Sequence, residues 1–322
     1  MTMPDTTTLS AKAILGLMNL PGIAAQRVHK IADRLEAQGS GLHHLLDYDA
    51  ASLVGGEILD ETQAVKYASE DQRRWRASVV DALQTDDIHL IPFTSEHYPD
   101  HLRTRPRTLA PPLLMVAGKV ELLDTPGVAF AGARDVSSDG QAISKQLAQQ
   151  AAASLFTVIS GGARGTDSLA HEEAVSTGGT TIVVLAEGML TSSSRRLVKT
   201  IDHGAVAVVS TFLPQGSWQT WRAMGRNNYI LGLSDRLMVI EARESGGTLA
   251  VGKLALKLDI DTWVLDYESP PPTASGNRLL LDLGAHPLPV NANLDIEIPD
   301  ELFALHDWKV EVRAPSCHQV QP

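Results

Sequence analysis

Cysteine is almost missing from this chain: Cys317 is the only one in 322 residues. One cysteine cannot form an intrachain disulfide, a cysteine zinc cluster or a CxxC redox pair. Cys317 also lies in a C-terminal stretch that we expect to be loosely ordered, so we assign it no nucleophilic role. This cysteine content fits a reducing compartment, and we predict a cytoplasmic protein.

Long hydrophobic runs and a leader sequence are missing as well. No apolar stretch approaches the roughly 20 residues that cross a bilayer. The first residues, MTMPDTTTLS, lack the charged and apolar regions of a signal peptide. We therefore expect neither a membrane span nor a membrane partner.

Positive charge is in deficit. The chain has 27 Lys and Arg against 38 Asp and Glu, a net charge of −11. A protein that coats nucleic acid nonspecifically needs a basic surface to neutralise phosphates, so this class is disfavoured. A local basic groove remains compatible with the composition.

Three motifs that carry catalysis or nucleotide binding are absent. The sequence has no G-x-G-x-x-G, no P-loop G-x-x-x-x-G-K-[ST] and no G-x-S-x-G. A nicotinamide dehydrogenase, a Walker-type ATPase and an α/β-hydrolase are therefore disfavoured. His43 and His44 have no third ligand at metal spacing. We predict no catalytic residue, no cofactor and no metal, and hence a protein that is not an enzyme.

The chain is organised around residues 127–180. This segment predicts a strand, a glycine-rich turn and a helix, and then a second set of the same three elements. The apolar run VAFAGA is typical of a strand buried on both faces. Ser137 or Ser138 is expected to cap the first helix, and Asp167 the second.

Strands and helices continue to alternate up to residue 292. Further buried strands are predicted at IHLIPF, PPLLMVAG, TIVVLAEGM, AVAVVS, LMVIEA and DTWVLD. This order predicts an α/β fold with a Rossmann-like, doubly wound, mostly parallel sheet. We expect three parts: a small helical domain over 1–86, the Rossmann-like domain over 87–292, and a tail over 293–322.

The N-terminal part shows helical periodicity on both sides of the sequence LPGI. This pattern has two interpretations: a helix-hairpin-helix that holds a DNA phosphate on its turn, or, preferred, a plain helical hairpin packed on its neighbours. Further along, Trp75 is expected to face inward. Arg73, Arg74 and Arg76 are expected to form a solvated face with nearby acids.

The glycine-rich turns predict an anion site. Each turn follows a strand and precedes a helix, and the carboxyl ends of parallel strands meet at one edge of a sheet. Helix N-termini attract phosphate, and glycines let it approach the backbone. Arg134 and Arg164 add charge. The alternative is that the glycines only permit tight turns and the arginines pair with acids.

Several motifs, in order, resemble the DNA-processing protein A family (DprA, also called Smf). They are GAR at 132–134, SGGARGTDSLAH at 160–171, VVLAEG at 183–188, RNN before GLS at 226–234, and EARESGGT at 241–248. The upstream YP, PPLLMVAG and LPGI segments also match. The resemblance covers roughly residues 9–290, and its N-terminal part implies a SAM- or helix-hairpin-helix-like domain.

The resemblance implies a cytoplasmic, homodimeric protein that binds single-stranded DNA, loads a RecA-type recombinase and acts in DNA recombination and natural transformation. It implies phosphate contacts through the backbone amides, charges and hydroxyls of a set of turn residues. These are Gly132, Arg134, Ser160, Gly161, Gly162, Arg164, Gly165, Arg226, Asn227, Gly246, Gly247 and Thr248. Bases are expected to stack on Trp218, Trp221 or Tyr229.

The sequence departs from the family pattern around the expected groove. SSSRR follows Gly188 in place of an aromatic-proline and asparagine segment, Asn228 replaces an arginine, and the C-terminal winged helix of many members is not expected. These departures leave two alternatives to DNA binding: a nucleotide-ligand sensor in defence or signalling, and, ranked last, a nucleotide phosphoribohydrolase. Glu187 and Glu241 are expected to pair with Arg134 or Arg226.

Overall fold

The structure, a computed structural model, describes residues 5–291 and 293–304. Its centre is a nine-stranded sheet with the order β1-β2-β6-β5-β4-β3-β7-β8-β9. In chain order the strands are β1 (His89–Pro92), β2 (Leu113–Gly118), β3 (Gly127–Ala131), β4 (Thr157–Gly161), β5 (Thr181–Val184), β6 (Val206–Ser210), β7 (Arg236–Val239), β8 (Asp261–Tyr267) and β9 (His286–Val290).

Seven strands, β3 to β9, run parallel to one another. At one end of the sheet, β2 pairs antiparallel with β6 and β1 pairs antiparallel with β2. From β3 the chain winds outward through β4, β5 and β6, and then returns to place β7 on the other side of β3. The prediction of a doubly wound, mostly parallel sheet is therefore confirmed. The direction of winding reverses between β3 and β7, which makes this the topological switch point.

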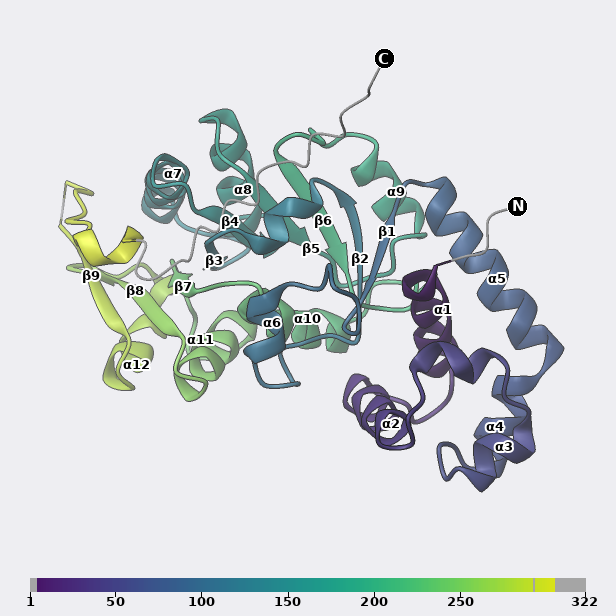
Figure 1. The fold of residues 1–322 in the computed structure, drawn as a ribbon. Coiled ribbons are helices and arrows are strands. Elements are labelled where there is room, and N and C mark those ends of the chain that lie inside the picture. The colour runs from purple at the N-terminus through teal and green to yellow at the C-terminus, as the bar shows by residue number, and fades with distance from the viewer. Residues whose placement is uncertain (1–4, 292, 305–322) are drawn as a thin grey trace, which may run out of the picture.

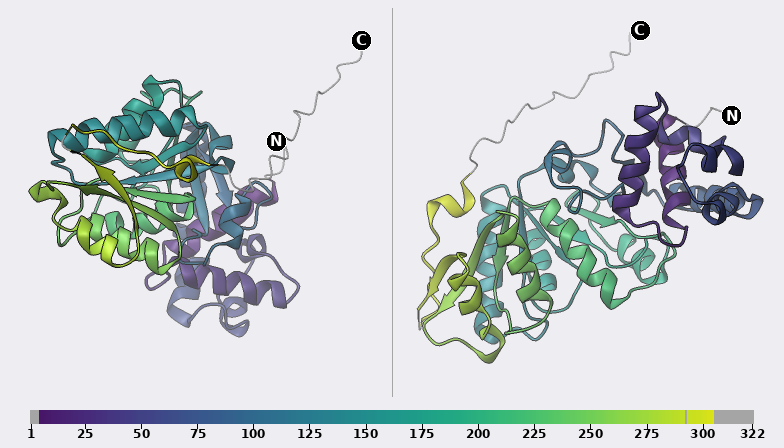
Figure 2. Two further views of the ribbon diagram at one scale, coloured as in Figure 1. Left: turned by 90° about the vertical axis from the view of Figure 1, so that its left-hand side faces the viewer. Right: turned by 90° about the horizontal axis from the view of Figure 1, so that it is seen from below.

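Helices cover both faces of the sheet, as Figures 1 and 2 show. The N-terminal part contains α1 (Thr6–Met18), α2 (Ala25–Ala37), α3 (Ala50–Gly55), α4 (Glu61–Ala68) and α5 (Glu70–Thr85). The remaining helices are α6 (Asp100–Thr104), α7 (Ser138–Ala153), α8 (Thr166–Ser176), α9 (Ser192–Val198), α10 (Thr220–Gly232), α11 (Gly247–Lys257) and α12 (Asn277–Asp282). Helices α7 and α8 lie on one face, and α10, α11 and α12 on the other (Figure 2).

The N-terminal helices pack at the end of the sheet that carries β1 and β2 (Figure 1). Their buried side chains, such as Leu17 and Leu35, belong to the same hydrophobic cluster as Met115 of β2 and Val208 of β6. Alternate residues of these strands face the opposite cluster, as the two-residue period of a strand requires. The N-terminal helices thus cover the β2–β6 end of the same sheet face that α7 and α8 cover near β3 and β4.

The LPGI segment forms the turn of a helical hairpin between α1 and α2, with Gly22 at a φ of +75°. Gln63 Nε2 donates to the Pro21 carbonyl at 3.0 Å, and Asp60 and Glu61 line the adjacent cavity. These carboxylates would repel a phosphate, which favours the plain hairpin.

The expectation for the arginines of α5 is partly wrong. Arg73 and Arg74 are exposed, and Arg74 pairs with Glu70 at 3.0 Å. Arg76, however, is 2% exposed and lies over the Tyr67 ring, 4.3 Å from its centroid, while donating to the Tyr67 carbonyl. Helical periodicity turns Arg76 toward the core, where the ring and a carbonyl take the place of water.

Residues 293–304 do not form the loosely ordered tail expected from their polar composition. Ile296 makes an antiparallel bridge with Val290, and a 3₁₀ turn spans Asp300–Phe303. Leu302 and Phe303 are buried in the cluster under α7 and α8. Hydrophobic anchors at the end of a polar stretch explain the difference. Residues 305–322, with Cys317, lie outside the described part.

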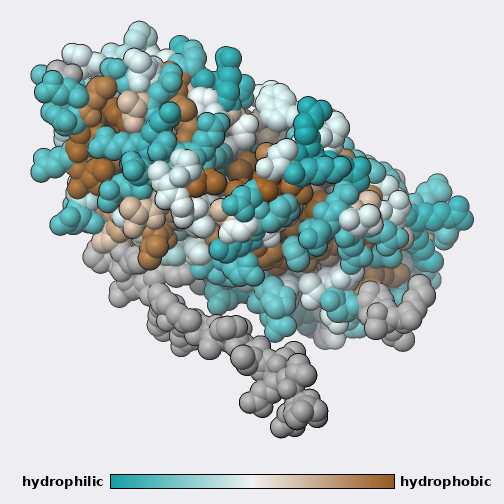
Figure 3. Space-filling view, turned by 90° about the horizontal axis from the view of Figure 1, so that it is seen from above, coloured by the Kyte–Doolittle hydropathy of each residue, from teal (hydrophilic) through white to brown (hydrophobic). Residues whose placement is uncertain are grey.

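The outer surface on the side of α7 and α8 is mostly hydrophilic. Figure 3 shows hydrophobic side chains there as patches interrupted by hydrophilic ones. Across the described part of the chain, none of the helices is both long and hydrophobic enough to pass through a bilayer.

Candidate functional site

A groove of about 490 Å³ opens at the topological switch point, above the carboxyl ends of β3 and β7. The turns after these two strands and one side of α10 form its walls. We call it the switch-point groove, lined among others by Gly132, Ala133, Arg134, Ser160, Asp167, Trp218, Met224, Arg226, Asn227, Glu241, Gly246, Gly247 and Thr248. Ligands of open α/β sheets bind at this kind of position.

A second, smaller cavity of about 430 Å³ adjoins the groove toward β4 and β5. We call it the side cavity. Its lining consists of Arg134, Gly162, Ala163, Arg164, Leu185, Ala186, Glu187, Trp218 and Arg226. The two spaces share Arg134, Ala163, Trp218 and Arg226, so they form one connected site.

The structure brings most of the expected phosphate contacts together. Eight line the switch-point groove: Gly132, Arg134, Ser160, Arg226, Asn227, Gly246, Gly247 and Thr248. Gly162 and Arg164 line the side cavity instead. Gly161 and Gly165, at either end of the turn after β4, line neither cavity.

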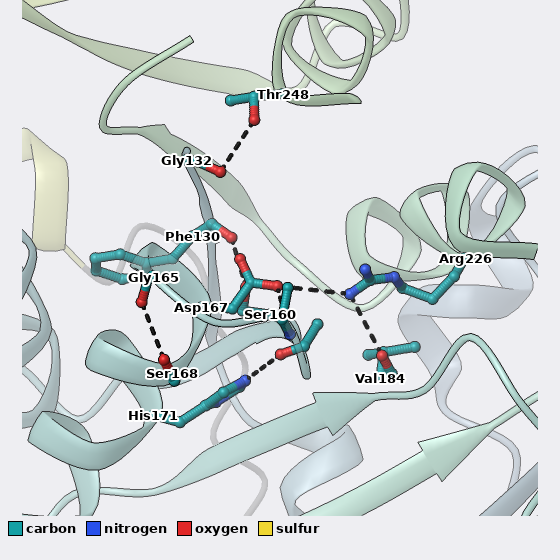
Figure 4. A network of polar contacts seen from close by, with 12 residues as sticks. Phe130, Gly132, Ser160, Gly165, Asp167, Ser168, His171, Val184, Arg226 and Thr248 are labelled. Atoms are coloured by element: carbon teal, nitrogen blue, oxygen red, sulfur yellow. Dashed lines mark hydrogen bonds and ion pairs between the residues drawn. The ribbon is translucent and has the colours of Figure 1, made fainter. Parts of the chain in front are cut away.

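We number the glycine-rich turns in chain order, so that the first follows β3, the second follows β4 and the third follows β7. A hydrogen bond joins the first turn to the third. Thr248 Oγ1, at the start of α11, donates to the Gly132 carbonyl at 3.1 Å (Figure 4). A Cβ on Gly132 would overlap Thr166, so only glycine allows the turn after β3 to touch α8. The N-cap of α11 is Gly246, whose φ of +110° likewise favours glycine. These contacts therefore fix the backbone that lines the groove.

Of the N-caps predicted for α7 and α8, the first is confirmed and the second is wrong. Ser137 caps α7, with its Oγ accepting from the Gly140 amide at 3.0 Å, which confirms one of the two serines proposed. The prediction for Asp167 is wrong, because Gly165 is the N-cap of α8 and Asp167 lies inside the first turn. Its carboxylate instead accepts from the Ala163 amide at 3.3 Å and so folds the second turn back on itself.

Arg226 comes from α10 and lies across the second turn rather than free in solvent (Figure 4). Its side chain is 11% exposed, pairs with Asp167 at 3.9 Å and donates to the Val184 carbonyl at 3.4 Å. Burial lowers the pKa of its guanidinium, and the nearby Asp167 carboxylate opposes this change. Part of its charge is thus offset within the protein, although it still lines both cavities.

Ser160 cannot offer the free hydroxyl that was expected. It is 1% exposed, and its Oγ donates to the Phe130 carbonyl at 2.7 Å (Figure 4). That bond joins β4 to β3 at their carboxyl ends. A buried hydroxyl needs a hydrogen-bond partner within the protein. The sequence does not reveal that this partner is the Phe130 carbonyl, which lies 30 residues away along the chain.

The expected pairing of Glu187 and Glu241 with arginines is also wrong. Glu241 is fully buried and accepts from the Ser137 amide at 3.0 Å, from the Ser137 hydroxyl and from the Tyr267 hydroxyl at 3.3 Å. It therefore sits at the positive N-terminus of α7. Glu187 accepts from the hydroxyls of Ser193 and Ser194 at the start of α9.

His171 contacts the backbone at the start of the second turn. It was not assigned a role from the sequence. Its Nε2 lies 2.7 Å from the Gly161 carbonyl, and its Nδ1 lies 2.6 Å from Thr181 Oγ1. Burial lowers the pKa of this ring. The sequence offered one signal for this role: His171 lies in the SGGARGTDSLAH stretch, four residues and thus one helical turn after Asp167.

The unpaired charge of the site rests on Arg134 and Arg164. Both are exposed, and within the described part of the chain neither has an acidic partner within 4.0 Å. Arg134 lines both cavities, and Arg164 lines the side cavity. The neighbouring Arg243 pairs with Asp135 at 2.6 Å instead. Backbone amides of the turns and these two free guanidinium groups make the site suitable for an anion.

Aromatic side chains flank this anion site unequally. Trp218 is 50% exposed and lines both cavities. Trp221 is 61% exposed but faces Phe212, 6.3 Å away between ring centroids, outside both cavities. Tyr229 is half-buried, and burial raises the pKa of its hydroxyl. Trp218 is therefore the aromatic residue placed to meet a ligand.

Comparisons with known proteins agree with one another. The family model described as DNA recombination-mediator protein A matches residues 89–296. Protein Smf of Escherichia coli (strain K12) is 31% identical over 206 residues, which cover 63% of this chain and 54% of the relative. DNA processing protein DprA of Bacillus subtilis (strain 168) is 26% identical over 226 residues, covering 69% and 75%.

Solved structures support the same fold. DNA processing protein A from Streptococcus pneumoniae superposes with a TM-score of 0.69 at 22% identity, covering 89% of this chain and 95% of that one. A Helicobacter pylori homologue, whose structure is described as showing a single-stranded DNA binding mode, has a TM-score of 0.52 at 23% identity, covering 62% and 90%. This chain spans about half the length of the Escherichia coli relative.

Proposed function

Since this chain belongs to the DNA recombination-mediator protein A family, we propose that it binds single-stranded DNA in the switch-point groove and acts in DNA processing and recombination. The observation that carries the proposal is the meeting of three glycine-rich turns and the unpaired Arg134 at one edge of the sheet. Backbone amides and a guanidinium contact phosphates without reading sequence. The net charge of −11 disfavours nonspecific binding of DNA over the rest of the surface.

We extend the proposal to the partners that family membership suggests. A RecA-type recombinase receives the bound strand, the protein acts as a homodimer in the cytoplasm, and natural transformation is its setting. It holds DNA without catalysing a reaction. We assign the site to a domain over 87–292 and the N-terminal helices to a helical domain over 1–86, whose described residues share a hydrophobic cluster with the sheet.

A mixed-sequence, fluorescently labelled oligonucleotide tests the DNA-binding step. We expect its affinity to fall with rising salt, because binding releases counterions from the phosphates. Arg134→Ala should weaken binding by about 1–3 kcal/mol, the typical loss of a charged hydrogen bond. Fluorescence anisotropy measures both effects.

Arg73→Ala is the matched control, because Arg73 is exposed on α5, away from both cavities. This variant should bind like the original protein. No binding at low salt, or equal losses in the two variants, would contradict the proposed interface.

A nucleotide sensor is the second candidate. The groove volume of about 490 Å³ favours it, since this is the size of pockets that enclose single small ligands. Saturable binding of a mononucleotide, with no gain for longer strands, distinguishes this function from DNA binding.

A further inference from the structure

An exposed ion pair joins the first turn to the third at the switch-point groove. Arg243 Nη2, from the third turn, donates to Asp135 Oδ2 of the first turn at 2.6 Å. Both residues line the groove, and their side chains are 51% and 61% exposed. The hydrogen bond from Arg243 lowers the pKa of Asp135, so this carboxylate is ionised at neutral pH. One cation of the groove is therefore neutralised by an anion of the same chain.

The backbone on each side of this pair is held by other contacts. Beside Arg243, the Ala242 amide donates to Asn277 Oδ1 at 2.8 Å. Two residues after Asp135, the Ser137 amide donates to a buried carboxylate at 3.0 Å. Neither turn has to move for the pair to separate, because rotation of the exposed side chains is enough.

The chemistry of the pair favours exchange for a phosphate. Exposed ion pairs contribute little stability, because water and salt weaken them and two long side chains lose freedom. A phosphate presents several anionic oxygens and can accept two parallel hydrogen bonds from one guanidinium. Among the described residues, only Nη2 of the Arg243 guanidinium has a hydrogen-bond partner. Its remaining N–H groups are therefore free to donate to a ligand.

We propose that Arg243 is a further phosphate contact of the switch-point groove and that Asp135 masks it until DNA binds. This inference rests on the proposed function. A phosphate of the strand replaces the Asp135 carboxylate on Arg243, and the released carboxylate turns to solvent. Arg134 lines the same groove without an acidic partner among the described residues, so it contacts phosphate without such a cost. Arg243 adds affinity only to the extent that phosphate outcompetes Asp135.

Asp135→Asn tests the masking, because it removes the charge and keeps the size of the side chain. Fluorescence anisotropy with a labelled oligonucleotide should show binding about tenfold tighter at low salt, the gain from one charged hydrogen bond to a phosphate. The slope of log affinity against log salt should steepen by about 0.7, the value for one more neutralised phosphate on a single strand. Urea unfolding should be nearly unchanged, because the lost pair is exposed.

Asp139→Asn is the matched control for the loss of one negative charge. Asp139 lies four residues later, in the first turn of α7, where it is exposed and lines neither cavity. It forms no ion pair with an arginine among the described residues. Because solvent screens its charge, this variant should change affinity by about twofold or less.

A double-mutant cycle tests whether the gain passes through Arg243. Arg243→Ala alone should weaken binding by about threefold or less, because its contact with phosphate is offset by the pair that must break. In the Asp135→Asn background the same change should remove the whole gain of about tenfold.

The outcomes separate this inference from the function beneath it. Unchanged affinity of Asp135→Asn, or an equal gain in Asp139→Asn, overturns the masking and leaves DNA binding intact. A gain that persists when Arg243 is also replaced overturns the role of Arg243. Absence of binding at low salt in the original protein and in every variant overturns both the inference and the proposed function.

Discussion

At Gly161 the lack of a side chain decides where a charged group sits. A Cβ on this residue would overlap the guanidinium of Arg226. Arg226 can therefore lie across the end of β4, close enough to Asp167 and Val184 to be held. The missing methyl group of Gly161 therefore makes room for the guanidinium of Arg226, which lines both cavities.

Replacing Gly161 by alanine should push the Arg226 guanidinium away from Asp167 and the Val184 carbonyl. We expect this to destabilise the protein by about 1–3 kcal/mol, the usual cost of leaving buried polar groups without partners. Urea unfolding measures the change in the free energy of unfolding. Gly162→Ala is the matched control, because its new Cβ would meet Val183 and Leu185 at 3.7 and 3.9 Å. That variant should stay within about 0.5 kcal/mol of the original protein. Equal stability of the two variants would show that Arg226 is not held by this contact.

The turns and the C-terminal segment matter as whole elements. The three glycine-rich turns meet because β3, β4 and β7 are neighbours in the sheet and end at the same edge. The segment 293–304 adds Leu302 and Phe303 to the hydrophobic cluster under α7 and α8. Phe303 packs against Phe156 with ring centroids 5.8 Å apart, and Arg236 donates to the Leu302 and Ala304 carbonyls.

Truncating Phe303 to alanine should cost about 3–5 kcal/mol, as for other large-to-small changes of buried aromatic residues. The neighbouring Glu301 is exposed in the same turn, so Glu301→Ala should change stability by less than about 0.5 kcal/mol. Thermal and urea unfolding of the two variants test whether the segment is part of the core. Similar small effects in both would mean that it is not.

On the scale of the molecule, the N-terminal helices are joined to the sheet rather than tethered beside it. Besides the shared hydrophobic cluster, Arg107 holds Asp33 of α2 through two hydrogen bonds of 2.5 and 2.7 Å. His29, also on α2, contacts the Ala110 carbonyl at 2.9 Å and the Phe93 ring. The helices should therefore unfold together with the part of the sheet that they cover.

This junction predicts a dependence of stability on pH. Burial lowers the pKa of His29 below its ordinary value of 6.5, against the opposing effect of its hydrogen bond to Ala110. The unfolded chain therefore binds a proton near pH 6.5 that the folded protein takes up only at lower pH. Its contribution to stability is present above 6.5 and is lost as the pH falls below that value.

His29→Gln tests this dependence, because glutamine can donate to Ala110 but does not titrate. In urea unfolding at about pH 7 and about pH 5, the variant should lose less stability on acidification than the original protein. His97→Gln, at an exposed histidine, is the control and should keep the original dependence. Identical slopes for all three proteins would exclude His29 as a source of acid sensitivity.

The sequence by itself determined the succession of elements and the placing of the turns. Alternating hydrophobic runs, glycines and a capping serine act locally, so they predict strands, helices and the edge where the turns meet. The same local patterns also indicated the resemblance to the DNA-processing protein A family, and the comparisons confirm it. The winding order then follows from the sterics of parallel crossovers.

Only the tertiary structure decided which polar groups already have hydrogen-bond or ion-pair partners within the protein. The hydroxyl of Ser160, the charge of Arg226 and the carboxylate of Glu241 are each satisfied by partners distant in sequence. The same holds for the anchoring of Phe303 and for the core that the N-terminal helices share with β2. A hydrogen bond or a buried contact depends on distances of a few ångströms between separate elements. These distances exist only once the chain is packed, which is why local patterns cannot supply them.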